Sequence, residues 1–233
     1  MSNSPLVRYA KMSPNHSGKR THAIDRITPH CVVLQCDVGA LGELFSKASR
    51  QASSNYGIGA DGQIGMFVEE CNRSWCSSDE ANDQRAVTIE CASDATEPYA
   101  MHDAVYRSLI YLCADICRRN GKTKLLWLGD KEKTLGYTPK PDEMVLTVHR
   151  WFANKSCPGD WLYDRLGDLA DKVTKLLIEK PLDNTAADWA KDAVNWALRN
   201  GILRGDERGD LMLHNPVTRE QLCVMLKRYT DLP

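Results

Sequence analysis

The sequence lacks several features that would assign it to a membrane, nucleic-acid-binding or secreted class. Its 30 Lys and Arg residues nearly balance 31 Asp and Glu residues, so the net charge of −1 does not favour a nucleic-acid partner. No run approaches the ~20 apolar residues of a membrane span, so no membrane partner is expected. Residues 1–20 contain no apolar core of signal-peptide length. We therefore expect a protein made in the cytoplasm.

The nine cysteines form no repeated Cys-x-x-Cys pair, and their number is odd. Several lie inside apolar runs, such as Cys113 and Cys117. Buried reduced thiols behave as small apolar side chains. The cysteines therefore indicate folding in a reducing compartment and exclude a disulfide framework.

Apolar patterns typical of strands and helices alternate after a polar N-terminal arm at residues 1–22. The Asp61-Gly62 pair predicts a hairpin over residues 54–68, whereas the polar residues 69–85 predict a loop. Alternation of this kind predicts an α/β domain, in which helices cover a sheet. Strands are expected over 27–36, 87–91, 124–129 and 144–149, and helices over 41–51, 101–119 and 159–177.

The pattern changes at a short linker, residues 179–185. Two helices are expected beyond it, over 187–200 and 218–229, joined by a Gly-rich loop. The predicted organisation is therefore a domain over 1–178, the linker, and a small helical module over 186–233. The simplest interpretation of that module is a helical hairpin that packs against the larger domain.

The stretch from His149 to Cys157 contains an imidazole, an ammonium group at Lys155 and a thiol, and a Pro-Gly turn follows. Zinc prefers nitrogen and thiolate ligands, and a catalytic zinc site uses three protein ligands and a water. His30, on a distant strand, is the candidate for the third ligand. Each histidine taken alone is more typical of a hydrogen-bonded core residue, and Cys157 alone of a structural thiol.

Glu90 and Tyr56 are two further candidates for chemistry. A buried, unpaired carboxylate within VTIEC would be costly, whereas Glu90 at a strand end facing a cleft would serve as a general base. The alternative is a structural pair with an arginine. Tyr56 precedes a glycine turn, where its phenol would donate a hydrogen bond. Lys155 would stabilise an oxyanion.

Four separated motifs, ITPHCVVLQC, SSNYGIGADGQI, AVTIECAS and HRWFANKSCPGD, carry a resemblance. They resemble those of zinc-dependent N-acetylmuramoyl-L-alanine amidases, which share their fold with peptidoglycan recognition proteins and phage-type amidase lysozymes. The resemblance covers residues 12–175. It implies an α/β fold with a central mixed β-sheet flanked by helices, a Zn²⁺ cofactor and a peptidoglycan substrate.

The resemblance also implies site residues by position. His30, His149 and Cys157 match the zinc ligands, Glu90 the base, and Lys155 the lysine that polarises the scissile carbonyl. Two further matches are Tyr56, near the metal, and Trp75, in the substrate groove. The sequence departs from the family at Cys76, where a histidine often follows the tryptophan. Cys31, next to His30, is expected on the opposite face of its strand and not as a ligand.

The implied reaction is hydrolysis of the amide between N-acetylmuramic acid and L-alanine. Zinc lowers the pKa of its bound water from roughly 15.7 towards about 7, and Glu90 would take the proton. Zinc and Lys155 would then stabilise the oxyanion. A peptidoglycan-binding protein without activity and a structural zinc protein are the alternatives.

The C-terminal stretch DWAKDAVNWALRNGILRG…NPVTREQLCVMLKRY resembles one S-layer homology motif, although Glu220 replaces the usual alanine. The resemblance implies binding of a secondary cell-wall polymer through Trp189, Thr218 and Arg219. Such proteins usually carry three motifs, and this chain has one. A single helical pair of this size buries little core, so it is expected either to dock on the larger domain or to self-associate, with a homotrimer as the favoured state.

The sequence also leads us to expect a particular biological setting for the protein. Without a signal peptide, a phage or prophage endolysin is expected, made in the bacterial host cytoplasm and released to a Gram-positive cell wall through a holin. A host autolysin or a spore-lysis amidase is the alternative context.

Overall fold

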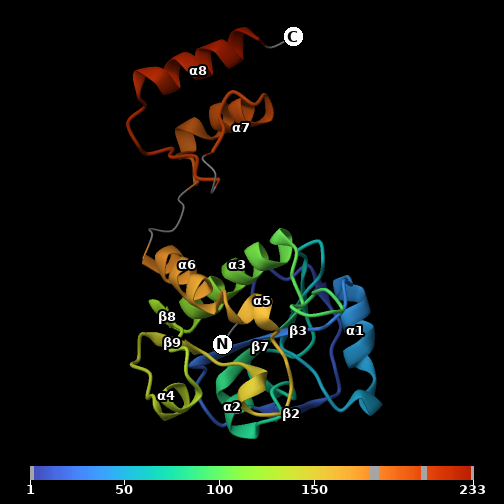
Figure 1. Ribbon diagram of the computed structural model, residues 1–233. Coiled ribbons are helices and arrows are strands. Elements are labelled where there is room, and N and C mark those ends of the chain that lie inside the picture. Colours follow the sequence, from blue (N-terminus) through green and yellow to red (C-terminus); the bar gives the residue numbers. More distant parts are fainter. Residues whose placement is uncertain (1–2, 179–183, 206–208, 232–233) are drawn as a thin grey trace. The chain divides into compact units, whose positions relative to one another are not determined.

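The computed structural model describes residues 3–178, 184–205 and 209–231. The chain divides into two compact units, Met1–Glu179 and Lys180–Pro233 (Figure 1). Of the predicted linker, residues 179–183 lie outside the described residues. Within the described ranges, no helix combines the length and apolar character needed to cross a bilayer.

The first unit is built on a seven-stranded sheet with the order β1-β5-β4-β7-β3-β9-β8. Most neighbouring strands are parallel, but β4 and β5 are antiparallel, so the sheet is mixed. A separate pair joins β2 to β6. The strands are β1 (Tyr9–Ala10), β2 (His16–Lys19), β3 (Arg26–Cys31), β4 (Tyr56–Ile58), β5 (Ile64–Met66), β6 (Asn72–Ser74), β7 (Ala86–Cys91), β8 (Lys124–Leu126) and β9 (Glu143–Leu146).

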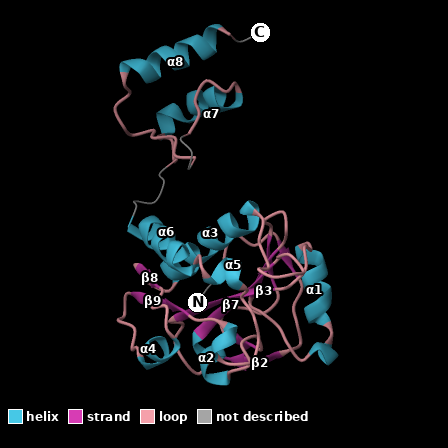
Figure 2. Cartoon of the chain, viewed as in Figure 1, coloured by secondary structure: helices cyan, strands magenta, loops and turns pink. Residues whose placement is uncertain are grey.

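Helices surround this sheet, as Figures 1 and 2 show. α3 and α6 pack against one another, and their apolar residues form the main core with the sheet. The predicted α/β fold with a mixed sheet flanked by helices is confirmed. The helices are α1 (Val38–Ser46), α2 (Glu80–Arg85), α3 (Asp103–Arg119), α4 (Lys131–Gly136), α5 (Asp160–Tyr163) and α6 (Leu166–Ile178), with the 3-10 helices η1 (Ala48–Arg50) and η2 (His149–Trp151).

The two central strands, β3 and β7, separate polar from apolar side chains by simple alternation. Thr28 pairs with Thr88 and His30 with Glu90, so these four side chains share one face. The residues between them face the other way and join the core beneath α3 and α6. The apolar partners are Ile27, Cys31, Val87, Ile89 and Cys91. The polar face is where a site can form.

The helix α1 covers part of this polar face, next to β4. Gly57 of β4 pairs with Glu90, and a Cβ atom there would lie 2.6 Å from Phe67 and 2.8 Å from Leu41 of α1. Glycine is therefore required for this close approach. Leu41, Phe45 and Phe67 form a second, smaller apolar cluster on this side.

Several predicted elements differ from the structure in detail. The arm expected over 1–22 contributes β1 and β2, so it is paired to both sheets. Residues 69–85 are not only a loop, because they form β6 and then α2, whose N-cap Asp79 accepts a hydrogen bond from the backbone N–H of Asn82. The helix expected over 159–177 is interrupted between α5 and α6.

The second unit contains the 3-10 helix η3 (Asp188–Ala190) and the helices α7 (Lys191–Arg199) and α8 (Arg219–Thr230). Thr218 caps α8, since its Oγ1 accepts from Gln221 N at 3.1 Å, and Gln221 Oε1 accepts from Thr218 N at 2.9 Å. Among the described residues of this unit, Ile202 alone is buried. The unit therefore has almost no core of its own.

Candidate active site

The site lies at the carboxyl end of the parallel strands. His30 and Glu90 are the next-to-last residues of β3 and β7, and they stand side by side in register. β9 runs parallel to β3, so the segment that follows Leu146 emerges at the same edge. Ligands of open α/β sheets commonly bind at this edge.

His149 and Cys157 reach the site from the segment after β9. The strand ends at Leu146, three residues before the predicted strand end, and His149 begins η2. The backbone N–H of Arg150 donates to Cys157 O at 3.0 Å, and the Arg150 guanidinium donates to Ser156 O at 2.6 Å. These bonds close the loop, which returns Cys157 to the sheet.

The turn after Cys157 depends on a glycine. Gly159 has φ +81°, and a Cβ atom there would lie 2.9 Å from both Pro98 O and a ring carbon of Tyr99. The backbone N–H of Trp161 also donates to Pro98 O at 3.0 Å. The predicted Pro-Gly turn is therefore confirmed, and it ties the end of the loop to the segment before α3.

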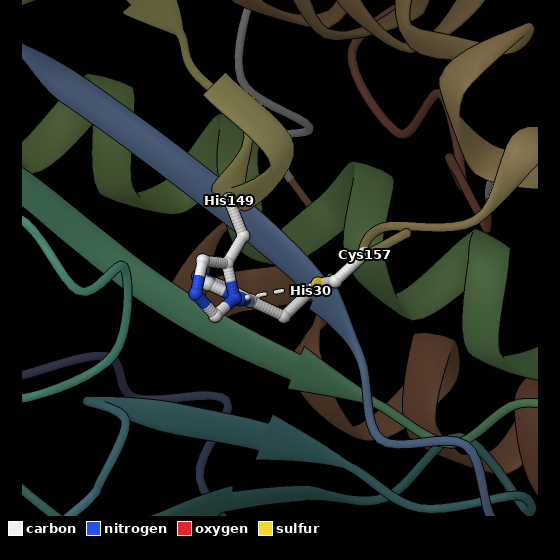
Figure 3. Close-up of side chains that lie close together, drawn as sticks. All are labelled: His30, His149 and Cys157. Carbon is white, nitrogen blue, oxygen red and sulfur yellow. Dashed lines mark hydrogen bonds between the residues drawn. The ribbon is translucent and has the colours of Figure 1, made fainter. Parts of the chain in front are cut away.

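Three side chains converge where these elements meet (Figure 3). The imidazoles of His30 and His149 have centroids 5.0 Å apart, and Cys157 Sγ lies 3.3 Å from His30 Nδ1. One potential ligand atom from each residue lies within 4.8 Å of the others. His30 Nε2 is buried and has no hydrogen-bond partner. A buried nitrogen without a partner is unusual in a folded protein, and a cation at this point would satisfy it.

The electrostatics of the three groups agree with metal binding. Burial holds the pKa of His30 well below its usual value, and the nearby His149 adds a smaller effect in the same direction. Burial also lowers the pKa of His149, with a smaller contribution from the charge of Lys155. Both imidazoles are thus neutral, the form that binds metals. Burial, followed by Cys31 and Glu90, raises the pKa of Cys157, so without a cation the thiol keeps its proton. Cys31 itself packs in the core.

A cleft of about 560 Å³ opens beside these side chains. Glu90, His149, Lys155 and Trp75 all line it, so the structure brings the predicted base, the predicted oxyanion-stabilising lysine and the predicted groove aromatic to one cavity. Trp75 Nε1 donates to Ser17 Oγ at 2.7 Å, which fixes the ring in the wall.

The carboxyl group of Glu90 has a pKa close to neutral pH. Its burial raises the carboxyl pKa to about 7, against smaller opposing effects from Arg50 and Cys76. Cys76 Sγ donates to Glu90 Oε1 at 3.8 Å, whereas Glu90 Oε2 is shielded from solvent and has no partner. Cys76 also forms a second possible metal group with His30 and Glu90. Because burial raises its pKa well above the usual value, Cys76 stays a neutral donor.

Tyr56 does not join this site, contrary to expectation. Its neighbour Gly57 pairs with Glu90, and Tyr56 pairs with Ile89, so the ring points to the opposite face of the sheet. There it is fully buried, donates to Glu70 Oε1 at 2.6 Å and accepts from Ser4 N at 2.9 Å. Its hydroxyl is therefore used in the core and is separated from the metal group by the sheet.

Most residues that line the cleft were not predicted from the sequence, and Arg50, Arg73 and Ser78 are three of them. Ser78 Oγ lies 3.0 Å from His149 Nε2, and Arg73 pairs with Glu80 at 2.9 Å. They come from η1, β6 and the loop before α2, which neither motif nor spacing links to Glu90. No signal in one sequence would have identified them.

The residues predicted to bind a wall polymer all lie in the second unit. Trp189 is 91% exposed and Arg219 is also exposed, so both are accessible to a ligand. Thr218, in contrast, has its hydroxyl engaged as the cap of α8.

Comparisons with known proteins extend this description. The fold is similar to the solved structure of PlyL, with a TM-score of 0.50 and 14% sequence identity over 71% of this chain and 95% of that chain. It is similar to the catalytic domain of XlyA, with a TM-score of 0.50 and 13% identity over 71% of this chain and 97% of that chain. It is also similar to a selenomethionine derivative of AmpD, with a TM-score of 0.50 and 15% identity over 77% of this chain and 100% of that chain. No curated protein matches the sequence.

A sequence profile of a known protein family also matches this chain. The profile described as N-acetylmuramoyl-L-alanine amidase matches residues 20–160, which is more than half of the chain and includes His30, Glu90 and Cys157. This chain belongs to the N-acetylmuramoyl-L-alanine amidase family.

Proposed function

We propose that this protein hydrolyses the amide bond between N-acetylmuramic acid and the L-alanine of the peptidoglycan stem peptide, with zinc as its cofactor. The observation that carries the proposal is the convergence of His30, His149 and Cys157 beside Glu90, at the edge of a cleft. Membership of the amidase family supports the same reaction.

The donor set fits zinc better than a hard cation. Two imidazoles and one thiol match the nitrogen and sulfur ligands of zinc, whereas Mg²⁺ and Ca²⁺ prefer oxygen. When bound, the ion supplies Lewis acidity that makes water nucleophilic near neutral pH. Across the described part of the chain, no fourth His, Cys or carboxylate joins His30, His149 and Cys157 in one group. Three protein ligands favour a catalytic site over a closed structural one.

Glu90 would act as the general base and then as the general acid. A base works best when its pKa is near the working pH, and burial brings that of Glu90 to about 7. Its unpartnered Oε2 is free to accept the proton of the attacking water. The protonated carboxyl would next deliver that proton to the leaving alanine nitrogen.

Lys155 would stabilise the negative charge that develops on the scissile carbonyl oxygen. It lines the same cleft as His149, and its charge contributes to the lowered pKa of that imidazole. A charged donor aimed at such an oxygen is worth more in a water-poor cleft than in bulk solvent. Trp75, fixed in the same wall, would contact the substrate.

For the second unit we propose binding of an anionic secondary cell-wall polymer, with Arg219 and Trp189 as contacts. Both side chains are exposed, and a guanidinium binds anionic groups in bidentate geometry. Thr218 would contribute by starting α8 and thereby placing Arg219.

Self-association as a homotrimer would cover the apolar surface of this unit. Among the residues described in this unit, the exposed large apolar side chains outnumber the one buried residue, and patches of this kind mark interaction sites. Sedimentation of the full chain as a monomer would contradict this part of the proposal. The exposed set is Trp189, Trp196, Leu198, Val217, Leu222, Val224, Leu226 and Tyr229. The role as a phage or prophage endolysin that reaches the wall through a holin stays a prediction.

Digestion of purified peptidoglycan, analysed by mass spectrometry, tests the reaction. The expected products are glycan strands with free lactyl carboxyl groups and peptides that begin with L-alanine. A zinc chelator should stop their release, and added zinc should restore it. Cleavage within the glycan or between peptide residues would refute the proposed bond, and unchanged release in chelator would refute the metal.

A further inference from the structure

Arg50 is a cation without a partner in the cleft. It ends η1, where its backbone N–H donates to Lys47 O at 3.0 Å and the next residue, Gln51, turns the chain in a left-handed conformation with φ 51°. The side chain is exposed and lines the cleft together with Glu90. No hydrogen bond or ion pair links its guanidinium to any residue that the structure describes. A short, well-fixed turn thus presents an uncompensated charge to the site.

Apart from Glu90, the acidic groups of the cleft are engaged with other partners, and Lys155, the other cation of the cleft that forms no ion pair with a described residue, is assigned to the scissile carbonyl oxygen. Glu80 pairs with Arg73 at 2.9 Å, so its carboxylate is not available to Arg50. Asp79 caps α2, and Asp83 accepts from the backbone N–H of Cys76 at 3.0 Å. The acidic residues in this wall are therefore committed to local structure.

Glu90 does not neutralise Arg50 either, but it lies near enough to feel its charge. The Arg50 charge is the largest of the effects that oppose the burial-induced rise in the Glu90 pKa, yet no hydrogen bond joins the two side chains. Arg50 thus lies beyond contact distance from the proposed base and still within its electrostatic reach. The scissile amide would lie next to Glu90, so Arg50 would face a neighbouring part of the substrate.

The chemistry of peptidoglycan narrows what that part can be. Its glycan is uncharged near the scissile bond, whereas its stem peptide carries carboxylates. The residue after L-alanine is joined to the chain through its side-chain carboxyl, so its α-carboxyl group projects freely as an acid or, in other walls, as a carboxamide. Two extended residues span roughly 7 Å, so this group would lie near the base and out of contact with it.

We infer that Arg50 is a specificity-determining residue, whose guanidinium binds the free α-carboxylate of the stem-peptide residue that follows L-alanine. The inference rests on the proposed amidase function. A guanidinium holds a carboxylate through two parallel charge-assisted hydrogen bonds, but it finds no matching acceptor pair in a carboxamide. The protein should therefore prefer walls in which this group is not amidated.

The test uses the zinc-loaded full chain and two synthetic muramoyl peptides that differ only in this group, one a carboxylate and one a carboxamide. The quantity measured is the ratio of kcat/KM for the acid to that for the amide. Any effect of Arg50 on Glu90 cancels in this ratio, because it applies to both substrates. We expect a ratio of roughly tenfold or more for the wild type, expressed mainly in KM.

Arg50→Gln should bring the ratio to about one, whereas Lys47→Gln should leave it unchanged. Lys47 is a matched control, since it is exposed, lies three residues away, carries the same charge and does not line the cleft. Equal wild-type rates on the two substrates, or an Arg50→Gln variant that keeps the preference, would overturn the inference. Failure of the wild type to release alanine-terminated peptide from either substrate would instead refute the proposed function.

Discussion

The two units of this chain treat apolar and polar side chains in opposite ways. The first buries its apolar residues between the sheet and α3 and α6, and it turns polar residues of the central strands toward one cleft. The second leaves most of its large apolar side chains exposed and buries only Ile202 among its described residues. The first unit can therefore be understood from its own interior, whereas the described residues of the second unit form almost no interior at all.

Within the first unit, the polar groups on the two faces of the sheet differ in how fully they are hydrogen-bonded. On the α3 side, the Tyr56 hydroxyl donates to Glu70, and Glu70 pairs in turn with Arg119, so this buried network is satisfied. On the cleft side, His30 Nε2 and Glu90 Oε2 are buried and have no partner. Buried polar atoms are nearly always hydrogen-bonded, so the lack of partners at His30 Nε2 and Glu90 Oε2 supports the proposed roles of these two residues in binding the ion and the substrate.

The largest expected effect is that of Glu90→Gln. Loss of a general base should lower kcat by about 10²- to 10⁴-fold. Zinc content should stay the same, because Glu90 is not among the three proposed ligands. Steady-state hydrolysis of a soluble muropeptide, with metal analysis of the same sample, makes the measurement. Glu80→Gln, which removes a carboxylate from the cleft rim, is the control and should keep most activity. Activity within a factor of a few of the wild type would remove Glu90 from the mechanism.

Lys155→Ala should have the next largest effect. Removal of one oxyanion donor typically lowers kcat by about 10²- to 10³-fold. Zinc should remain bound, and the pKa of His149 should rise, because the Lys155 charge is one of the two causes that lower it. NMR titration of the imidazole in the metal-free protein would detect the rise. Normal turnover in this variant would exclude the proposed role.

Tyr56→Phe should lower the free energy of unfolding and leave the rate of hydrolysis nearly unchanged. The change leaves Ser4 N without its acceptor and Glu70 with one donor fewer, which should cost about 1–3 kcal/mol in the free energy of unfolding. Urea denaturation measures the cost. At a temperature where the variant is folded, kcat should stay within about twofold of the wild type. A large fall in kcat at unchanged stability would place the phenol in the active site after all.

Thr218→Ala should have the smallest effect, confined to the second unit. Loss of an N-cap costs about 1 kcal/mol, because Gln221 N loses its acceptor, whereas the backbone N–H of residue 218 can still donate to Gln221 Oε1. Hydrogen exchange should therefore accelerate in α8. Hydrolysis of soluble muropeptides should not change. A fall in that hydrolysis would show that the second unit supports the chemistry of the first.

The sequence predicted the type of fold because its strands and helices follow simple periodicities. β3 and β7 were anticipated with His30 and Glu90 on them, and α3 matches its predicted helix nearly end to end. The α2 helix was missed because a short polar helix shows no apolar stripe, and its only sign was the capping residue Asp79.

The candidate site was harder to predict where it depends on strand register. The family resemblance placed Tyr56 near the metal, but Gly57 is the residue that pairs with Glu90, so Tyr56 faces the other way. A shift of one residue exchanges the two faces of a strand, and nothing in one sequence fixes that register. Arg50 was missed for a related reason: only the folded chain brings η1 to the cleft.

Zinc K-edge X-ray absorption on the purified, zinc-loaded full chain tests the central claim most directly. The account predicts four-coordinate zinc with one sulfur at about 2.3 Å, two imidazole nitrogens at about 2.0–2.1 Å and one light atom from solvent. Cys157→Ser should remove the sulfur signal, whereas Cys76→Ser should leave it in place. A spectrum with no sulfur, with two sulfurs, or with a sulfur that survives Cys157→Ser would contradict the assignment of His30, His149 and Cys157 as the metal site.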